Sequence, residues 1–318
     1  MLRLFTRWLW VVCLALPAHG FGAESKQAAQ QCFQAGRIRV FYFLEGPHAV
    51  DPADANGNSV PDQVEDAITQ TAAAQMLFVD VLGFTDPFES PHFRAARFLD
   101  IHFRSKETLR NNGVAYDELQ RFRRPSDPLG TMSLCFNLAT SVKPGANLTP
   151  AHEYFHLVQY AATRFKARWF TEGTARWSEY ALKEGSLGPV RAEAEWPPGK
   201  EKQAALFGMT YEASEHFWNA LAAKTDAAGS FPDSSRLADL RAMRYADGKT
   251  KVLKDNRLTG WQFMRELLRE LDAADDLALK SLGYSEWSEQ NQCAPANNRY
   301  LLEAVGRALQ ARAAKEPL

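Results

Sequence analysis

The chain has 318 residues, enough for one large domain or two small ones. Hydrophobic residues make up 46% of it, with 20 Phe and 8 Trp, which argues against disorder and for a sizeable core. Its 37 Lys and Arg nearly balance its 38 Asp and Glu, so no basic excess is present to attract nucleic acid or an anionic membrane, and we expect neither partner.

The first twenty residues predict a secretory signal peptide. Arg3 and Arg7 form its positive start, an apolar core runs over 8–16, and a small-residue cleavage zone follows at 17–20. The apolar core is too short to serve as a membrane anchor. We therefore expect a signal peptide at 1–20, with export to the periplasm or the extracellular space.

Three cysteines follow the predicted signal peptide: Cys32, Cys135 and Cys293. In an oxidising compartment this odd count allows one disulfide and one leftover thiol. Cys135 lies in an apolar segment typical of a buried strand, so we expect a core thiol there. Cys32 and Cys293 flank the folded region, and we predict a Cys32–Cys293 disulfide.

β-Branched and aromatic residues predict strands at 37–43, 98–103 and 130–138. Within the second strand His102 alternates with Ile101, so we expect His102 to face outward at the surface. The third strand directly precedes the helix described below. We expect it to border a cleft as an edge with which an extended peptide can pair.

Residues 54–65 carry oxygen-bearing side chains at the spacing of a calcium loop. Ser59 replaces the glycine usual at the sixth place, and Pro61 is uncommon in an EF-hand, so the segment is more like the Asp/Asn-rich calcium turns of extracellular bacterial proteins. The alternative is a tight turn around Asn56-Gly57 that leads into a helix starting near Pro61 and ending at Gly83. The candidate calcium ligands are Asp54, Asn56, Asn58, Asp62 and Glu65.

The segment His152-Glu153-Tyr154-Phe155-His156 carries the most specific chemistry. Two histidines four apart on a helix project from one face, where they can bind one Zn²⁺ at ~2.0–2.1 Å. Thr149, as N-cap, and Pro150, in the first turn, predict the start of this helix. Because the helix is otherwise largely apolar, its two histidines need polar partners or a metal. Glu153 is placed to accept a proton from a metal-bound water.

A third ligand is available sixteen residues later, since Glu172 lies on the next predicted helix. Three protein ligands leave one position open, as a catalytic zinc site requires. Gly173 and Ala175 are small, and we expect them to let this helix approach the histidine-bearing one closely. Glu179 returns to the same face seven residues on, as either a group that orients a ligand or a solvated carboxylate.

These segments resemble the gluzincin metallopeptidases, in which His-Glu-x-x-His is followed by a glutamate in a Glu-Gly-x-Ala helix. The likeness to aminopeptidase N is distant, because its Gly-x-Met-Glu-Asn segment is lacking; the nearest string is Gly130-Thr131-Met132-Ser133. The closer likeness, over roughly residues 37 to 220, is to secreted bacterial metalloproteases of this class with an Asp/Asn-rich Pro-Asp segment. The resemblance implies that His152, His156 and Glu172 bind zinc and that Glu153 is the catalytic base.

We predict an α+β fold with two parts. Residues 24–185 form a small mixed sheet with the active-site helix, and residues 186–318 form an all-α C-terminal lobe. The resemblance implies a zincin-like, two-lobed metallopeptidase with the zinc helix at the floor of the cleft. The clearest helical segments of the second part are 203–223, 259–271 and 297–314.

The predicted activity is that of a secreted zinc-dependent endopeptidase acting on peptides or proteins. Zinc is the predicted cofactor, and calcium is a second one if residues 54–65 bind it. Tyr211 and His216 are candidates for stabilising the oxyanion, although both are also explained by packing. Two alternatives stay open: a non-catalytic extracellular binding protein stabilised by metals, and a zinc amidase acting on cell-wall peptides. Glu153 argues against the first, since a structural site has no use for it.

Overall fold

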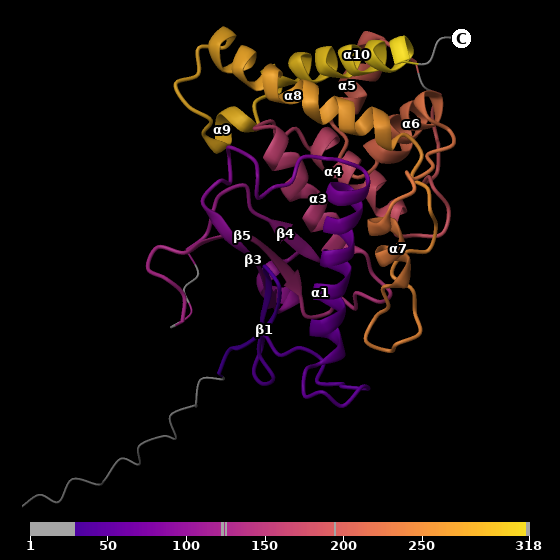
Figure 1. Cartoon of the computed structure of the whole chain (residues 1–318). Coiled ribbons are helices and arrows are strands. Elements are labelled where there is room, and N and C mark those ends of the chain that lie inside the picture. Colours follow the sequence, from indigo (N-terminus) through magenta and orange to yellow (C-terminus); the bar gives the residue numbers. More distant parts are fainter. Residues whose placement is uncertain (1–28, 122–123, 125, 194, 316–318) are drawn as a thin grey trace, which may run out of the picture.

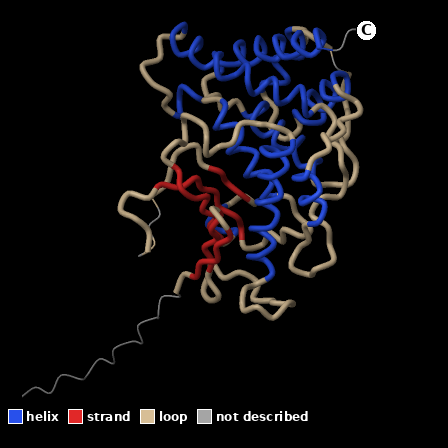
Figure 2. Tube along the Cα trace, viewed as in Figure 1, coloured by secondary structure: helices blue, strands red, loops and turns tan. Residues whose placement is uncertain are grey.

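The computed structural model describes residues 29–315 except 122, 123, 125 and 194, so the predicted signal peptide at 1–20 lies outside the described residues. A single block of strands lies toward one end of the molecule, and helices joined by loops make up the rest (Figures 1 and 2). The predicted α+β class is confirmed by this mixture of one sheet and many helices. Among the described residues, no helix combines the length and the apolar character needed to cross a bilayer.

The sheet has five strands in the order β1-β2-β3-β5-β4. The central strands β2, β3 and β5 are parallel, and β1 and β4 are antiparallel additions at the two edges. The predicted edge position of the strand at 130–138 is wrong. β4 pairs with the outer side of β5, with Gly113 opposite Leu138, so β4 and not β5 is the edge strand. The bounds are β1 Gln31–Ala35, β2 Ile38–Tyr42, β3 Ala96–Arg104, β4 Gly113–Ala115 and β5 Met132–Ala139.

One face of the sheet is the main hydrophobic core. Leu99, Ile101 and Phe103 of β3 are fully buried and belong to the cluster that includes residues of helices α1 (Asp62–Gln75) and α3 (Thr149–Ala162). Burial of each such side chain stabilises the fold by roughly 1.5–3 kcal/mol. This packing holds α3 in place next to β4 and β5.

The opposite face of the sheet is also covered, which corrects the expected exposure of His102. The segment after β4 folds over this face, where Asp127 pairs with Arg39 at 2.8 Å and Arg39 pairs with Asp100 at 2.6 Å. His102 is only 1% exposed and stacks on Phe41 with ring centroids 4.7 Å apart. Burial lowers its pKa to about 3, so the imidazole is neutral. The alternation in β3 correctly predicted that Ile101 and His102 lie on opposite faces of the sheet. Both faces are covered at the centre of the sheet, so His102 is buried as well.

The helices beyond the sheet partly follow the predicted segments. The predicted helix at 203–223 is interrupted, because α5 ends at Phe207 before Gly208 and helical structure resumes only at Ser214. Helices α8 and α10 pack on each other at the end of the molecule away from the sheet (Figure 1). The remaining bounds are α2 Lys106–Leu109, η1 Met76–Val81, α4 Arg168–Ser178, η2 Glu179–Ala181, α5 Lys200–Phe207, η3 Ser214–Trp218, α6 Asn219–Thr225, α7 Ser235–Ala242, α8 Trp261–Ser281, α9 Glu289–Gln292, η4 Pro295–Asn297 and α10 Asn298–Lys315.

Helix α3 begins where predicted, with a different cap. Thr149 is the first helical residue, and its backbone N–H and its hydroxyl both donate to Asn147 Oδ1, at 2.8 and 2.6 Å. Pro150 lies in the first turn, as expected. At the other end of the helix, the Thr163 hydroxyl donates to Asp275 of α8 at 2.8 Å. Both ends of α3 are therefore fixed by side-chain hydrogen bonds.

The predicted Cys32–Cys293 disulfide is wrong, since Cys32, Cys135 and Cys293 are all free thiols in the described part of the chain. Cys32 belongs to β1 and Cys293 directly follows α9, and these two elements lie at opposite ends of Figure 1. A disulfide requires Cα atoms within about 7 Å. The core position expected for Cys135 is confirmed, because this thiol is 1% exposed.

Candidate metal centre

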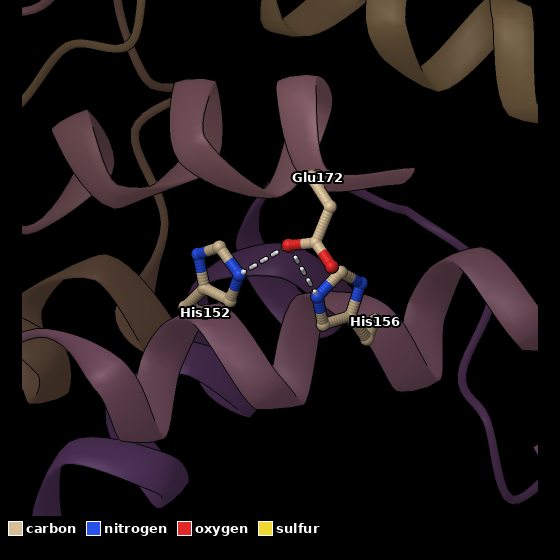
Figure 3. A group of neighbouring side chains, drawn as sticks. All are labelled: His152, His156 and Glu172. Atoms are coloured by element: carbon tan, nitrogen blue, oxygen red, sulfur yellow. Dashed lines mark ion pairs between the residues drawn. The ribbon is translucent and has the colours of Figure 1, made fainter. Parts of the chain in front are cut away.

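Two helices bring together three side chains that could hold a metal ion. Helix α3 presents His152 and His156 on one face, and α4 carries Glu172 above them (Figure 3). Glu172 Oε2 lies 3.5 Å from His152 Nε2 and 3.6 Å from His156 Nε2. One ligand atom from each residue lies within 4.8 Å of the other two, so the group could hold a metal ion. It is the only such group among the residues that the structure describes.

The spacing of these atoms fits a small cation. Glu172 Oε2 is buried without a hydrogen-bond partner among the described residues, and its separations from the two imidazoles are too long for hydrogen bonds. Ligands bound tetrahedrally at ~2.0–2.1 Å stand about 3.4 Å apart. Two imidazole nitrogens and one carboxylate oxygen are also a donor set that Zn²⁺ accepts. Both distance and chemistry therefore suit a zinc-like ion.

Polar side chains behind the histidines fix their ring orientation. His152 Nδ1 lies 3.0 Å from Glu179 Oε1 and His156 Nδ1 lies 2.7 Å from Gln159 Oε1. Carboxylates only accept, and Gln159 uses its amide nitrogen to donate to the Thr171 carbonyl at 2.8 Å. Each Nδ1 therefore carries a proton, so Nε2 is the nitrogen that faces Glu172 and that could bind a metal once it is unprotonated. Glu179 is 7% exposed, so its alternative as a solvated carboxylate is excluded.

The pKa shifts of His152 and Glu172 both indicate that the group favours a positive charge. Burial opposes protonation of His152, but the carboxylates of Glu172 and Glu179 outweigh it and raise the His152 pKa to about 10. Burial alone would raise the pKa of Glu172, whereas the two neighbouring histidines hold it well below its usual range. A divalent cation would supply the same compensation to Glu172, and its binding would release the proton.

Glu153 lies between the two histidines in sequence, and its side chain points to the edge strand β4. It is 4% exposed, and burial raises its pKa, although His156 and His152 oppose that shift. A Cβ on Gly113 of β4 would stand 2.6 Å from Glu153 Cγ, closer than real Cβ contacts allow. The carboxylate is thus enclosed between the two histidines and the edge of the sheet, a placement that the sequence alone did not reveal.

An open cleft of about 720 Å³ reaches one side of this group, because His152 and the neighbouring Glu153 form part of its lining. Tyr211 also lines it, with its ring centroid 6.0 Å from that of His152. Burial, followed by the charges of Glu172 and Glu153, raises the Tyr211 pKa to about 12. His216 borders the same cleft. Both aromatic candidates therefore lie at the cleft, with Tyr211 in ring contact with a candidate ligand.

The second predicted site, at 54–65, forms a loop closed by its own hydrogen bonds. Asp54 Oδ1 accepts from the backbone of Gly57 at 2.8 Å, and Asn58 Nδ2 donates to Glu65 at 2.6 Å. Asn56 Nδ2 also donates to Glu65, and Asp62 accepts from the backbone of Ala55. The predicted turn and the helix after it, α1, are confirmed; calcium binding stays a prediction.

One residue of α4, Gly173, behaves differently from expectation, and the sequence analysis missed two residues of the site, Gln159 and Gly113. The small size of Gly173 serves packing against η3, because a Cβ there would meet Trp218 Cδ1 at 2.7 Å; its predicted role toward α3 is wrong. Gln159 lies three residues after His156, a helical spacing that could have pointed to it. Gly113 carries no such signal, since its contact with Glu153 depends on strand pairing.

Comparison of the chain with protein families, with curated proteins and with solved structures finds no match. The case for function therefore rests on the geometry of the candidate metal centre.

Proposed function

We propose that this chain is a zinc-dependent endopeptidase of the gluzincin type. The observation that carries the proposal is Glu172 Oε2, buried without a hydrogen-bond partner among the described residues and 3.5–3.6 Å from two histidine nitrogens. A purely structural zinc site is closed by four protein ligands, whereas this group offers three ligands beside an open cleft. Three ligands beside an open cleft favour a catalytic metal over one that only stabilises the fold.

His152, His156 and Glu172 would hold the zinc, and Glu179 and Gln159 would keep the imidazoles oriented. A zinc ion in such a site supplies Lewis acidity, which polarises a carbonyl and lowers the pKa of a coordinated water toward ~7. Glu153 would accept the proton of the attacking water and then deliver it to the leaving amine. The Tyr211 hydroxyl, at the rim of the cleft, would donate to the developing oxyanion.

The proposed architecture is zincin-like with two lobes. The cleft is lined from one side by β4 and the start of α3, and from the other by Tyr211 and His216, which belong to the predicted C-terminal lobe. A substrate in this cleft would pass over the α3 histidines, with β4 as the free edge for backbone pairing. Export through the residue 1–20 signal peptide and calcium binding at 54–65 are parts of the same proposal that rest on the sequence.

The decisive experiment replaces Glu153 by Gln, which keeps the shape of the side chain and removes its basicity. We expect Glu153→Gln to bind zinc and fold normally but to hydrolyse unstructured proteins at least ~10²–10⁴-fold more slowly. Glu303→Gln, on the exposed side of α10, is the matched control and should leave the rate unchanged. Internal cleavage of a peptide library by the wild type alone supports an endopeptidase. Equal activity in both proteins, or none in either with zinc bound, would favour the binding-protein alternative; hydrolysis only of cell-wall peptides would favour the amidase.

A further inference from the structure

The walls of the cleft beside the candidate metal centre differ in how their charges are compensated. On the helical side, Arg176 and Lys183 both pair with Glu179, at 2.9 and 3.2 Å, and Arg191 pairs with Glu215. These cations already have acidic partners within the protein. They therefore offer less to a bound ligand than a cation with no acidic partner would.

The wall next to the edge strand β4 carries two basic side chains that have no acidic partner among the described residues. Lys106, at the start of α2, and Arg110, directly after it, both line the cleft. Within the described residues neither forms an ion pair; Lys106 Nζ instead donates to the neutral side chain of Asn112 at 2.7 Å. An anionic group that enters the cleft here would meet two positive charges that are not held in an ion pair within the described chain.

Local structure fixes the backbone that carries these two side chains relative to Glu153. The Ser105 side chain caps α2, and the Arg110 backbone N–H donates to the Lys106 carbonyl at 2.8 Å. Asn112, which holds Lys106, has its backbone carbonyl bonded to the Ala139 N–H, so the connection to β4 is anchored to β5. Gly113 then touches Glu153. Arg110 lies three positions before Gly113, which limits their Cα atoms to about 11 Å apart.

From this arrangement we infer that the cleft selects peptides with a carboxylate within about three residues of the scissile bond, bound by Lys106 and Arg110. The scissile carbonyl must approach Glu153, and an extended peptide advances by ~3.3–3.6 Å per residue. A carboxylate one to three residues away therefore reaches the basic wall. The inference rests on the proposed peptidase function, for which it names the substrate class.

The carboxylate has two sources in a peptide: an Asp or Glu side chain, or the C-terminus itself. Both present the same acceptor to Lys and Arg. If the C-terminus is the group recognised, the enzyme would release short C-terminal fragments; if a side chain is recognised, it would cut within acidic sequences. The experiment below separates the two.

The test uses zinc-loaded full-length protein and two sets of quenched fluorescent peptides. One set has a blocked C-terminus and carries Glu or Gln at each of three positions on either side of the cleaved bond. The other lacks acidic side chains and ends in a free acid or an amide one to three residues beyond that bond. We expect kcat/KM to favour the carboxylate member of at least one set by about tenfold or more, and the preference to shrink as ionic strength rises from about 0.05 M to about 0.5 M.

The variant Lys106→Gln/Arg110→Gln should abolish that preference while still cleaving the neutral peptides. Arg110→Lys should keep most of it, and Arg269→Gln, on α8 and outside the cleft lining, should keep all of it. A second readout needs no turnover: Glu153→Gln should bind the labelled acidic peptide more tightly than its amide counterpart. Equal cleavage of all peptides, or a preference unchanged in the double variant, would overturn this inference alone. No cleavage of any peptide would overturn the proposed function, and equal binding by Glu153→Gln would then overturn the inference too.

Discussion

Gly113 and Glu153 belong to separate elements, yet the strand backbone at Gly113 lies directly against the Glu153 side chain. A Cβ at residue 113 would be 2.6 Å from both Cγ and Cδ of Glu153. β4 also reaches Glu153 from the other end, where the backbone of Ala115 donates to the carboxylate. The edge strand and the proposed catalytic base are therefore positioned as one unit.

Gly113→Ala should displace the Glu153 carboxylate. Because catalytic groups must be held to within a fraction of an ångström, we expect proteolytic kcat to fall by about tenfold to a hundredfold. Zinc content should not change, since neither residue is a proposed ligand. Gly199→Ala is the control, because a Cβ there meets nothing closer than 4.0 Å. Normal activity in Gly113→Ala would show that the contact between Gly113 and Glu153 is not needed for activity.

Gln159→Ala should weaken zinc binding without removing a ligand. The variant loses the acceptor of His156 Nδ1, which orients that ring, and outer partners of this kind contribute about 10–100-fold to metal affinity. Competition with a fluorescent zinc chelator would measure the change. Gln63→Ala, another buried glutamine bonded to backbone, controls for general destabilisation and should keep wild-type affinity.

His156→Ala should lose the tightly bound zinc altogether. Elemental analysis of the purified protein is expected to give one zinc per wild-type chain and none per variant chain. Because zinc binds only the folded site, a zinc-selective chelator should lower the unfolding temperature of the wild type and leave that of the variant unchanged. His48→Ala, whose ring contacts the Ser105 backbone, should retain its zinc. Full zinc retention by His156→Ala would contradict the ligand assignment.

The helical spacing of the site could be predicted from the sequence, and the strand contacts could not. His152, His156 and Glu179 follow from the 3.6-residue period, because a helix fixes the relative direction of its own side chains. The contact of Gly113 with Glu153 depends instead on β4, a three-residue strand with too little pattern to recognise. His102 shows the same limit: alternation gives the face of a strand, whereas burial depends on what later folds over it.

The predicted Cys32–Cys293 disulfide is wrong for a related reason. Positions near the two ends of a chain say nothing about distance in the fold. Cys32 is placed by its pairing with Phe41 across β1 and β2, while Cys293 is placed by the turn after α9. Only the full set of long-range contacts determines that these two sites are far apart.

Calcium should stabilise the loop at 54–65, if its oxygen atoms exchange their mutual hydrogen bonds for the ion. We expect a higher unfolding temperature in calcium than in a calcium-selective chelator, with zinc kept saturating. The double variant Asp54→Asn/Glu65→Gln should lose this difference, and Glu303→Gln should retain it. An unchanged unfolding temperature in the wild type would support the plain turn.

Asp275 should make stability depend on pH. Burial raises its pKa to about 7, although hydrogen bonds from Thr163 and Arg164 oppose the shift. Between its usual pKa, near 4, and about 7, the folded state binds the extra proton, so the free energy of unfolding should fall as pH rises through this window and then level off. The slope from one group is at most about 1.4 kcal/mol per pH unit.

Asp275→Asn carries no titrating proton and should flatten that slope. Urea unfolding from about pH 5 to about pH 8 would measure it. Asp66→Asn is an informative comparison, since burial raises the Asp66 pKa only to about 6 and its contribution should end at lower pH. Identical pH profiles for wild type and Asp275→Asn would contradict the buried-carboxyl argument.

The short length of β4 has a consequence for solubility. A terminal strand with an unpaired outer side is a template on which another copy of the chain can add its own strand, and long flat edges of this kind drive aggregation. Here the edge offers only Gly113–Ala115, between the α2 turn and the segment that folds over the sheet. Three residues can align a short extended segment, but they provide too few backbone bonds to nucleate a growing intermolecular sheet.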